Sequence, residues 1–244
     1  MAQATPLHDV LVLQHTIEDH PGYLGQWLND QRVDWQVFCA EAGQAYPDSV
    51  APYRALAVLG GEWSANDERP SLRHAETLIR EADALGVPVI GHCLGGQLIA
   101  RAFGGRVARL PQPEVGWLPI AVHEAPAARA WFGDARLPTV YQWHYDSFVE
   151  MPAGAQWLAS SPACAHQAFA LGIHLAMQFH IEITPDKMAD WLAEPGNVYP
   201  DAIARYPDSV QPPEAMRAAT ARHQADSEAL ADVIYSAWRA RWRG

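Results

Sequence analysis

A short apolar strand that turns through glycines into an apolar helix constrains this chain more than any other stretch. Residues 87–90 are mostly apolar, Cys93 stands between Gly91 and Gly95, and apolar residues then recur at helical spacing through Phe103. A sharp strand-to-helix turn needs glycines wherever a Cβ atom would clash, and it holds its apex residue outward at the edge of the sheet. The stretch therefore predicts a nucleophile elbow with Cys93 at the corner.

A thiol at this corner has the surroundings that a nucleophile needs. The N–H groups and the positive dipole end of the helix favour the thiolate of Cys93, the form that attacks carbonyl carbons. The same N–H groups can stabilise an oxyanion. A buried, unreactive cysteine beside an ordinary loop explains this stretch equally well when it is taken alone. A histidine and a carboxylate elsewhere in the chain are needed to decide.

The order of the expected elements predicts an α/β fold. Apolar runs indicate strands and apolar stripes indicate helices, in the order strand 9–14, helix 23–29, strand 33–38, strand 55–59, helix 72–85 and the elbow. Strands that alternate with helices form a parallel sheet covered on both faces. An apolar stripe predicts that a last helix, over about 214–243, packs on this sheet, so we expect residues 1–244 to form a single domain.

Composition narrows the classes of function. The formal net charge of −11 argues against nucleic-acid binding, because phosphate contacts require clustered lysines and arginines. No window approaches the ~18 uninterrupted apolar residues of a membrane span, and no secretory signal is visible. The three cysteines lack the spacing of a disulfide framework, so we expect a reducing cytoplasm. The sequence shows no metal-ligand cluster, and we predict neither a metal nor a cofactor.

Two further stretches supply the groups that the elbow lacks. Gly60 and Gly61 end the third expected strand, where backbone N–H groups can approach a ligand closely, although an ordinary loop also fits. Residues 175–183 alternate like a strand and place His180 and Glu182 side by side. A carboxylate next to an imidazole fixes its tautomer and leaves the other nitrogen to take a proton from a thiol. The alternative is a solvated polar strand face.

Together these motifs resemble the class I glutamine amidotransferases, a family with a Cys-His-Glu triad. The resemblance rests on Gly60–Gly61, Gly91–Leu98 and Gln178–Glu182. Three more stretches resemble the free-standing members that look like the amidotransferase domain of GMP synthase, namely Glu114–Trp117, Trp143–Asp146 and Gln167–Phe169. The resemblance implies a three-layer sandwich with a central, mostly parallel, flavodoxin-like sheet and a site at the C-terminal ends of the strands.

The resemblance also implies a role for each catalytic residue. Cys93 would be the nucleophile, His180 the general base and then acid, and Glu182 the group that orients His180. The backbone N–H groups of Gly61 and Leu94 would form the oxyanion hole.

Substrate contacts follow from the same resemblance. Gln97 would contact the glutamine substrate, and Ser147 with Phe148 would supply the backbone segment that binds its amino-acid end. The chain departs from the commoner family patterns at Glu62, where a proline usually follows two glycines, and at Ile181, where proline is usual. Neither departure removes a reacting group, but Glu62 puts an acid near the site.

The implied reaction is attack of a thiolate on the γ-carboxamide of glutamine, release of ammonia, and hydrolysis of a γ-glutamyl thioester. The chain has no synthetase domain and no phosphate-binding Gly-x-x-x-x-Gly-Lys-Ser/Thr loop, so an ammonia acceptor would belong to a separate synthetase subunit. Two alternatives stay open. One is a γ-glutamyl peptide or amide hydrolase that uses the same triad, and the other is a catalytically silent binding subunit.

Overall fold

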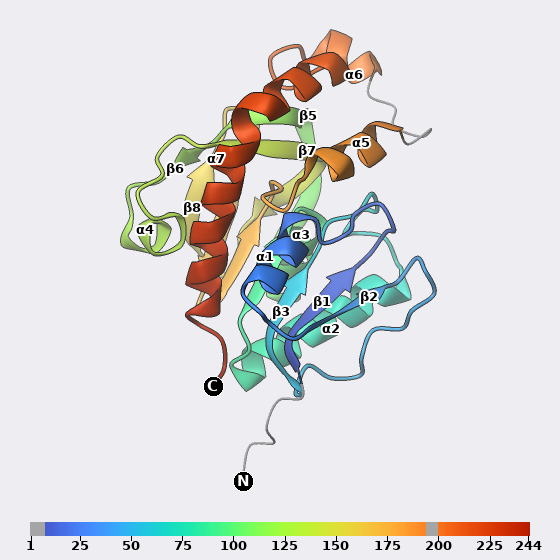
Figure 1. The fold of residues 1–244 in the computed structure, drawn as a ribbon, viewed down its shortest axis with the longest axis vertical. Helices are drawn as coiled ribbons and strands as arrows, with labels where there is room; N and C mark the ends of the chain where they lie inside the picture. Colours follow the sequence, from blue (N-terminus) through green and yellow to red (C-terminus); the bar gives the residue numbers. More distant parts are fainter. Residues whose placement is uncertain (1–7, 194–199) are drawn as a thin grey trace.

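The fold is built on one twisted sheet with helices on both faces (Figure 1). A computed structural model describes residues 8–193 and 200–244. The eight strands lie in the order β2 (Trp35–Cys39), β1 (His8–Gln14), β3 (Tyr53–Val58), β4 (Val89–His92), β10 (His174–Met177), β9 (Ala168–Leu171), β8 (Gln156–Ser160) and β6 (Ala121–Val122). The first five strands in this order are parallel, and the remaining three are antiparallel. The arrangement of the parallel strands confirms the predicted flavodoxin-like α/β sheet.

Two apolar cores, one on each face of the sheet, make the fold three-layered. Successive residues of β1 point to opposite cores: Val10 and Val12 belong to one, and Leu11 and Leu13 to the other. Helices α1 (Tyr23–Asp30), α4 (Pro126–Phe132) and α7 (Pro213–Arg239) cover the first face, and α2 (Pro70–Leu85) and α3 (Leu94–Ala102) cover the second. Among the helices that the structure describes, none combines the length and the apolar character of a membrane span.

A separate pair of long antiparallel strands rises beside the main sheet (Figure 1). The strands are β5 (Arg106–Pro119) and β7 (Thr139–Glu150). A third apolar cluster joins them to α5 (Pro185–Ala193), α6 (Pro200–Arg205) and the start of α7. The side chain of Gln211 fastens this region by bonding both the N–H and the carbonyl of Trp117.

Two expected elements are shorter than the sequence predicts. The strand expected over 175–183 ends at Met177, because helix α3 packs against the Met177 carbonyl and the chain turns away from the sheet there. The last helix ends at Arg239 rather than near 243. Beyond it the chain folds back, and Trp242 packs edge-on against Trp238 with 5.2 Å between ring centroids.

The close approach of α3 to the strands predicts the effect of adding one methyl group. We expect Gly95→Ala to prevent folding or to lower the melting temperature strongly, because its Cβ would lie 2.0 Å from the Val58 carbonyl oxygen. Gly25→Ala in α1 is the matched control. Its Cβ meets nothing closer than 3.4 Å, and alanine is better than glycine inside a helix by roughly 0.5–1 kcal/mol. Thermal unfolding followed by circular dichroism compares the two variants, and equal melting temperatures would contradict the packing.

Candidate active site

The corner between β4 and α3 has the strained backbone that a nucleophile elbow requires. Cys93 has φ of 48° and ψ of −109°, a conformation that residues with a side chain rarely adopt. Its N–H donates to the Met177 carbonyl at 2.9 Å, which ties the corner to the end of β10. Gly95 and Gly96 let α3 approach the strand ends more closely than any side chain would allow. The sequence prediction of an elbow at Cys93 therefore matches the local geometry.

A pocket of about 420 Å³ opens above this corner. Its lining comes from the segments that follow the C-terminal ends of β1, β3 and β4, from residues 143–146 of β7, and from Trp191 of α5. Cys93 and His180 both face the pocket, as do the carboxylate residues Glu62 and Asp146 and the guanidinium of Arg109. The volume falls in the usual range for small-molecule sites.

His180 and Glu182 meet in a bend rather than along a strand. His180 Nδ1 lies 2.6 Å from Glu182 Oε1, and both side chains are buried, so the alternative of a solvated polar face is wrong. The backbone N–H of His180 donates to the carbonyl of Tyr141 at 2.9 Å, and the Trp191 ring contacts the imidazole edge-on. Because Nδ1 is held by the carboxylate, Nε2 is the ring nitrogen left for proton exchange.

The charges around His180 set its protonation state. Burial disfavours the imidazolium, but the charges of Glu182 and Cys93, together with a hydrogen bond to each, raise the pKa of His180 to about 10. Burial alone would raise the Glu182 pKa, yet Lys187 and His180 hold it well below its usual range. At neutral pH the pair is therefore an imidazolium and a carboxylate, and the imidazolium can donate a proton to a departing amine.

The predicted oxyanion-hole residues lie next to each other at the pocket. A Cβ on Gly61 would come within 3.2 Å of the Leu94 side chain, so the turn after β3 and the first residue of α3 are in contact. A Cβ on Gly60 would lie 2.3 Å from Asp19 and 3.0 Å from the His180 ring. Gly61 lines the pocket without a side chain, which suits a carbonyl oxygen that approaches backbone N–H donors.

The predicted substrate-binding residues separate into two groups. Gln97 lines the pocket, and its Nε2 donates to the Asp146 carbonyl at 3.0 Å. Ser147 and Phe148 do not line the pocket. Ser147 Oγ contacts Cys164 Sγ at 3.2 Å, and Phe148 packs edge-on against Phe169 in the second core. The residues just before them, 143–146, face the pocket instead, so the sequence assignment is displaced along β7.

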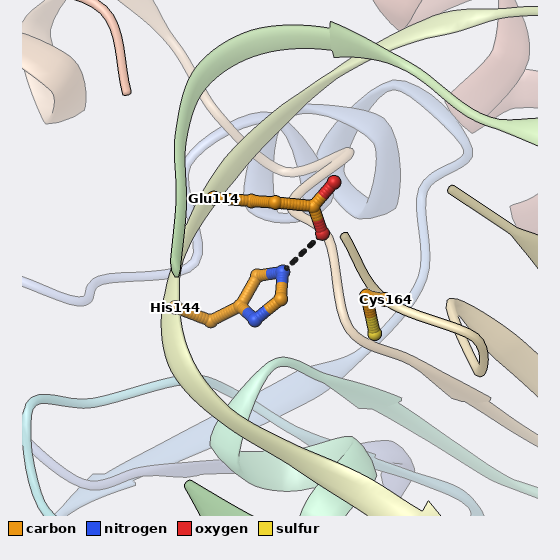
Figure 2. A group of neighbouring side chains, drawn as sticks. All are labelled: Glu114, His144 and Cys164. Atoms are coloured by element: carbon orange, nitrogen blue, oxygen red, sulfur yellow. Dashed lines mark hydrogen bonds and ion pairs between the residues drawn. The ribbon is translucent and has the colours of Figure 1, made fainter. Parts of the chain in front are cut away.

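A buried polar cluster lies behind the pocket wall and joins residues that are far apart in the sequence (Figure 2). It joins Glu114 of β5, His144 of β7 and Cys164, and their ligand-type atoms lie within 4.8 Å of one another. Glu114 accepts bonds from Gln167 at 2.6 Å and Ser161 at 2.6 Å and also contacts His144 at 3.1 Å. A metal ion would have to displace these bonds, and burial raises the pKa of the Cys164 thiol to about 12. The arrangement fits a hydrogen-bonded support for the wall, with His144 as a satisfied structural histidine, better than a metal centre.

A second buried group, in contact with Glu182, was also not predicted from the sequence. Asp19 and Lys187 pair directly, and Lys187 Nζ also lies 3.1 Å from Glu182 Oε1. Asp19, His180 and Glu182 together have the spacing of a metal site, but the Lys187 ammonium already stands between the two carboxylates. One signal in the sequence points to this position, since Lys187 is the only lysine in the chain.

A cysteine at a strained strand-to-helix corner, with a hydrogen-bonded histidine and carboxylate beside it, defines an enzyme of the cysteine-nucleophile acyl-transfer class. The model of the family "Glutamine amidotransferase class-I" matches residues 39–194. The chain belongs to the class I glutamine amidotransferase family.

Relatives with different reactions resemble this chain to similar degrees. A glutamine amidotransferase structure from Methylobacillus flagellatus superimposes with a TM-score of 0.91 at 31% identity, covering 97% of this chain and 96% of that one. One of the subunits of the glutamine-hydrolysing GMP synthase of Saccharolobus solfataricus is 35% identical over 56% of this chain and 71% of its own length. The γ-glutamyl peptidase 3 of Arabidopsis thaliana is 28% identical over 66% of this chain and 69% of its own length.

The His180 pKa is expected to depend on the charge of its partner. In Glu182→Gln the charge that offsets burial is lost, so we expect the His180 pKa to fall from about 10 by ~1–3 units. Imidazole titration by ¹⁵N NMR measures this shift directly. His174, whose Nε2 lies 3.0 Å from Asp83, is the control histidine and should titrate as in the wild type. An unchanged His180 titration would mean that Glu182 is not the group that sets its charge.

Proposed function

We propose that this chain hydrolyses the γ-carboxamide of glutamine through a γ-glutamyl thioester on Cys93. The observation that carries the proposal is the strained Cys93 corner, which faces the same pocket as the buried His180–Glu182 pair. Family membership supports the reaction class, because the relatives include part of a glutamine-hydrolysing GMP synthase. All three catalytic side chains are present and buried, which argues against a silent binding subunit.

The proposed chemistry uses the Cys93 thiolate as the nucleophile and the His180 imidazolium as the proton donor. The Cys93 thiolate attacks the amide carbon, and the oxyanion that forms is stabilised by the N–H groups of Gly61 and Leu94. The C–N bond breaks as the His180 imidazolium donates its proton, so ammonia leaves and a thioester stays on the enzyme. Neutral His180 then takes a proton from water, hydroxide attacks the thioester, and glutamate leaves as the thiolate is restored. Glu182 keeps the imidazole oriented in both halves.

Released ammonia would serve a separate synthetase subunit. The relative that resembles this chain in Saccharolobus solfataricus is one subunit of a larger enzyme, which supports an acceptor on another chain. The nucleophile must stay reduced, and all three cysteines are free, which fits the cytoplasmic setting expected from the sequence.

A γ-glutamyl peptide or amide is the second candidate substrate, and the residues that line the pocket support it. Beyond Cys93 the pocket continues to the side chains of Trp63, Tyr145 and Arg109. Aromatic surfaces and a guanidinium suit an amino-acid leaving group with its own carboxylate, and ammonia would use none of them. The likeness to a γ-glutamyl peptidase supports the same alternative.

A substrate comparison tests the proposal and its alternative together. Purified protein is incubated with glutamine or with γ-glutamyl dipeptides, and glutamate release is measured beside Cys93→Ala. We expect turnover of glutamine at the higher kcat/KM, and a loss of at least ~10³-fold in Cys93→Ala, because the covalent route disappears. Faster hydrolysis of the dipeptides would establish the peptidase alternative. Equal activity in Cys93→Ala would refute both, provided that circular dichroism shows the variant folded.

A further inference from the structure

The only lysine of the chain occupies an unusual position. Of the 17 lysine and arginine residues in the chain, all except Lys187 are arginines. Lys187 is also the one among them whose side chain is completely buried. It stands in the first turn of α5, where the helix dipole disfavours a cation. Burial disfavours an ammonium group as well. Specific partners must therefore hold this charge in place.

Three oxygen atoms surround the Lys187 ammonium. Nζ contacts a carboxylate oxygen of Asp19, lies 3.1 Å from Glu182 Oε1, and donates to the His20 carbonyl at 2.8 Å. A compact ammonium can donate in three directions at once, whereas the planar guanidinium of arginine presents its donors in a fixed fork. The placement of these three oxygen atoms around Nζ explains why residue 187 is a lysine in a chain whose other basic residues are arginines.

Lys187 is held as a cation by two buried carboxylates. Burial alone would lower its pKa, but the charges of Asp19 and Glu182 raise the Lys187 pKa above its usual value. The remaining titratable groups around the cluster are His20, Asp190, His92, Tyr235, His180 and Cys93.

Most of these surrounding groups add no positive charge near Glu182. Burial lowers the pKa of His92 to about 4 and raises the pKa of Tyr235 well above its usual value, so both are neutral at pH 7. Burial, and then the Lys187 charge, lower the pKa of His20. The cations that face Glu182 within the described residues are therefore Lys187 and the His180 imidazolium.

The same oxygen of Glu182 receives both cations. Oε1 lies 2.6 Å from His180 Nδ1 and 3.1 Å from Lys187 Nζ, so the ammonium holds the same oxygen that faces the imidazole. The backbone is held as well, because Tyr23 N–H donates to the Glu182 carbonyl at 2.9 Å.

We infer that Lys187 is a positioning residue for the reaction proposed above. Its ammonium keeps Glu182 ionised and turned toward His180. Without the ammonium, Asp19 and Glu182 are two buried carboxylates with too little positive charge between them, and one takes up a proton more readily. A protonated Glu182 no longer stabilises the imidazolium, so catalysis is lost at a higher pH than in the wild type.

The pH dependence of kcat/KM tests this role. The variant Lys187→Met keeps a side chain of similar length and removes its charge. In this variant we expect the acidic limb of the kcat/KM profile to move to higher pH by ~1–3 units. Asp19→Asn is the matched control, because it alters the same cluster but removes a negative charge, and its acidic limb should not move up. A Lys187→Met profile that loses height but keeps the wild-type acidic limb would show a merely structural lysine and overturn the inference.

If Lys187→Met does not fold, a variant with balanced charges takes its place in the experiment. Lys187→Met combined with Asp19→Asn removes one charge of each sign, and thermal unfolding establishes whether it folds. Glu182 still loses the cation in direct contact with it, 3.1 Å away, while the loss of the Asp19 charge offsets part of the effect, so a smaller upward shift of the acidic limb should persist. A wild-type limb in the folded double variant would overturn the inference.

A spectroscopic test separates this inference from the proposed reaction, because it needs no turnover. Labelling with [¹⁵Nζ]lysine gives one side-chain signal, since the chain has one lysine. We expect ammonium protons that exchange slowly with solvent, and a signal that shifts in Glu182→Gln. A signal whose protons exchange rapidly with solvent, and whose chemical shift is unchanged in Glu182→Gln, would overturn the role of Lys187. Absence of Cys93-dependent turnover in the wild type would instead overturn the proposed function.

Discussion

The contact between helix α3 and the ends of β3 and β10 is the constraint on which the site depends. Gly95 lies against the Val58 carbonyl, Gly96 lies against the Met177 carbonyl, and the Cys93 N–H bonds the same Met177 oxygen. These contacts hold Cys93 at a positive φ that a residue with a side chain otherwise avoids. The strain places the thiol at the pocket, and the helix N-terminus behind it points donors toward the same space.

The rest of the pocket is brought to this corner by topology. Parallel strands end at one edge of the sheet, so the segments after β1, β3, β4 and β10 meet there although they are distant in sequence. The separate β5–β7 pair adds the facing wall, where the Trp143 carbonyl lies 3.8 Å from Cys93 Sγ. The Glu114–His144 contact stiffens this wall from behind. The third apolar cluster in turn fastens β5 and β7 to α5 and α7.

Sequence patterns predicted the elements that depend on neighbouring residues. They failed where contacts between distant segments determine the structure. The strands near 9–14 and 55–59 and the elbow follow from short apolar runs and glycines, and the structure has them at those places. His180 and Glu182 do meet, but the strand that was expected to align them stops at Met177, and a buried bend brings them together. Ser147 and Phe148 lie just beyond the pocket along β7, an offset that alternation alone does not fix. The clusters around Glu114 and Lys187 join residues from several elements, so no spacing rule reveals that these residues meet, although the motifs of the resemblance include Glu114, His144 and Gln167.

Charge balance inside the site links the fold to its chemistry. Asp19 and Glu182 bring two negative charges into a buried region, and Lys187 offsets only one of them. Among Asp19, Glu182, Lys187 and His180, a neutral His180 would leave one negative charge uncompensated, whereas the imidazolium balances the charges of these four groups. Burial usually drives histidine toward its neutral form, but here the surrounding negative charges reverse that preference and raise the His180 pKa to about 10. In the reaction proposed above, the arrangement of buried charges therefore keeps on His180 the proton that the leaving amine takes up.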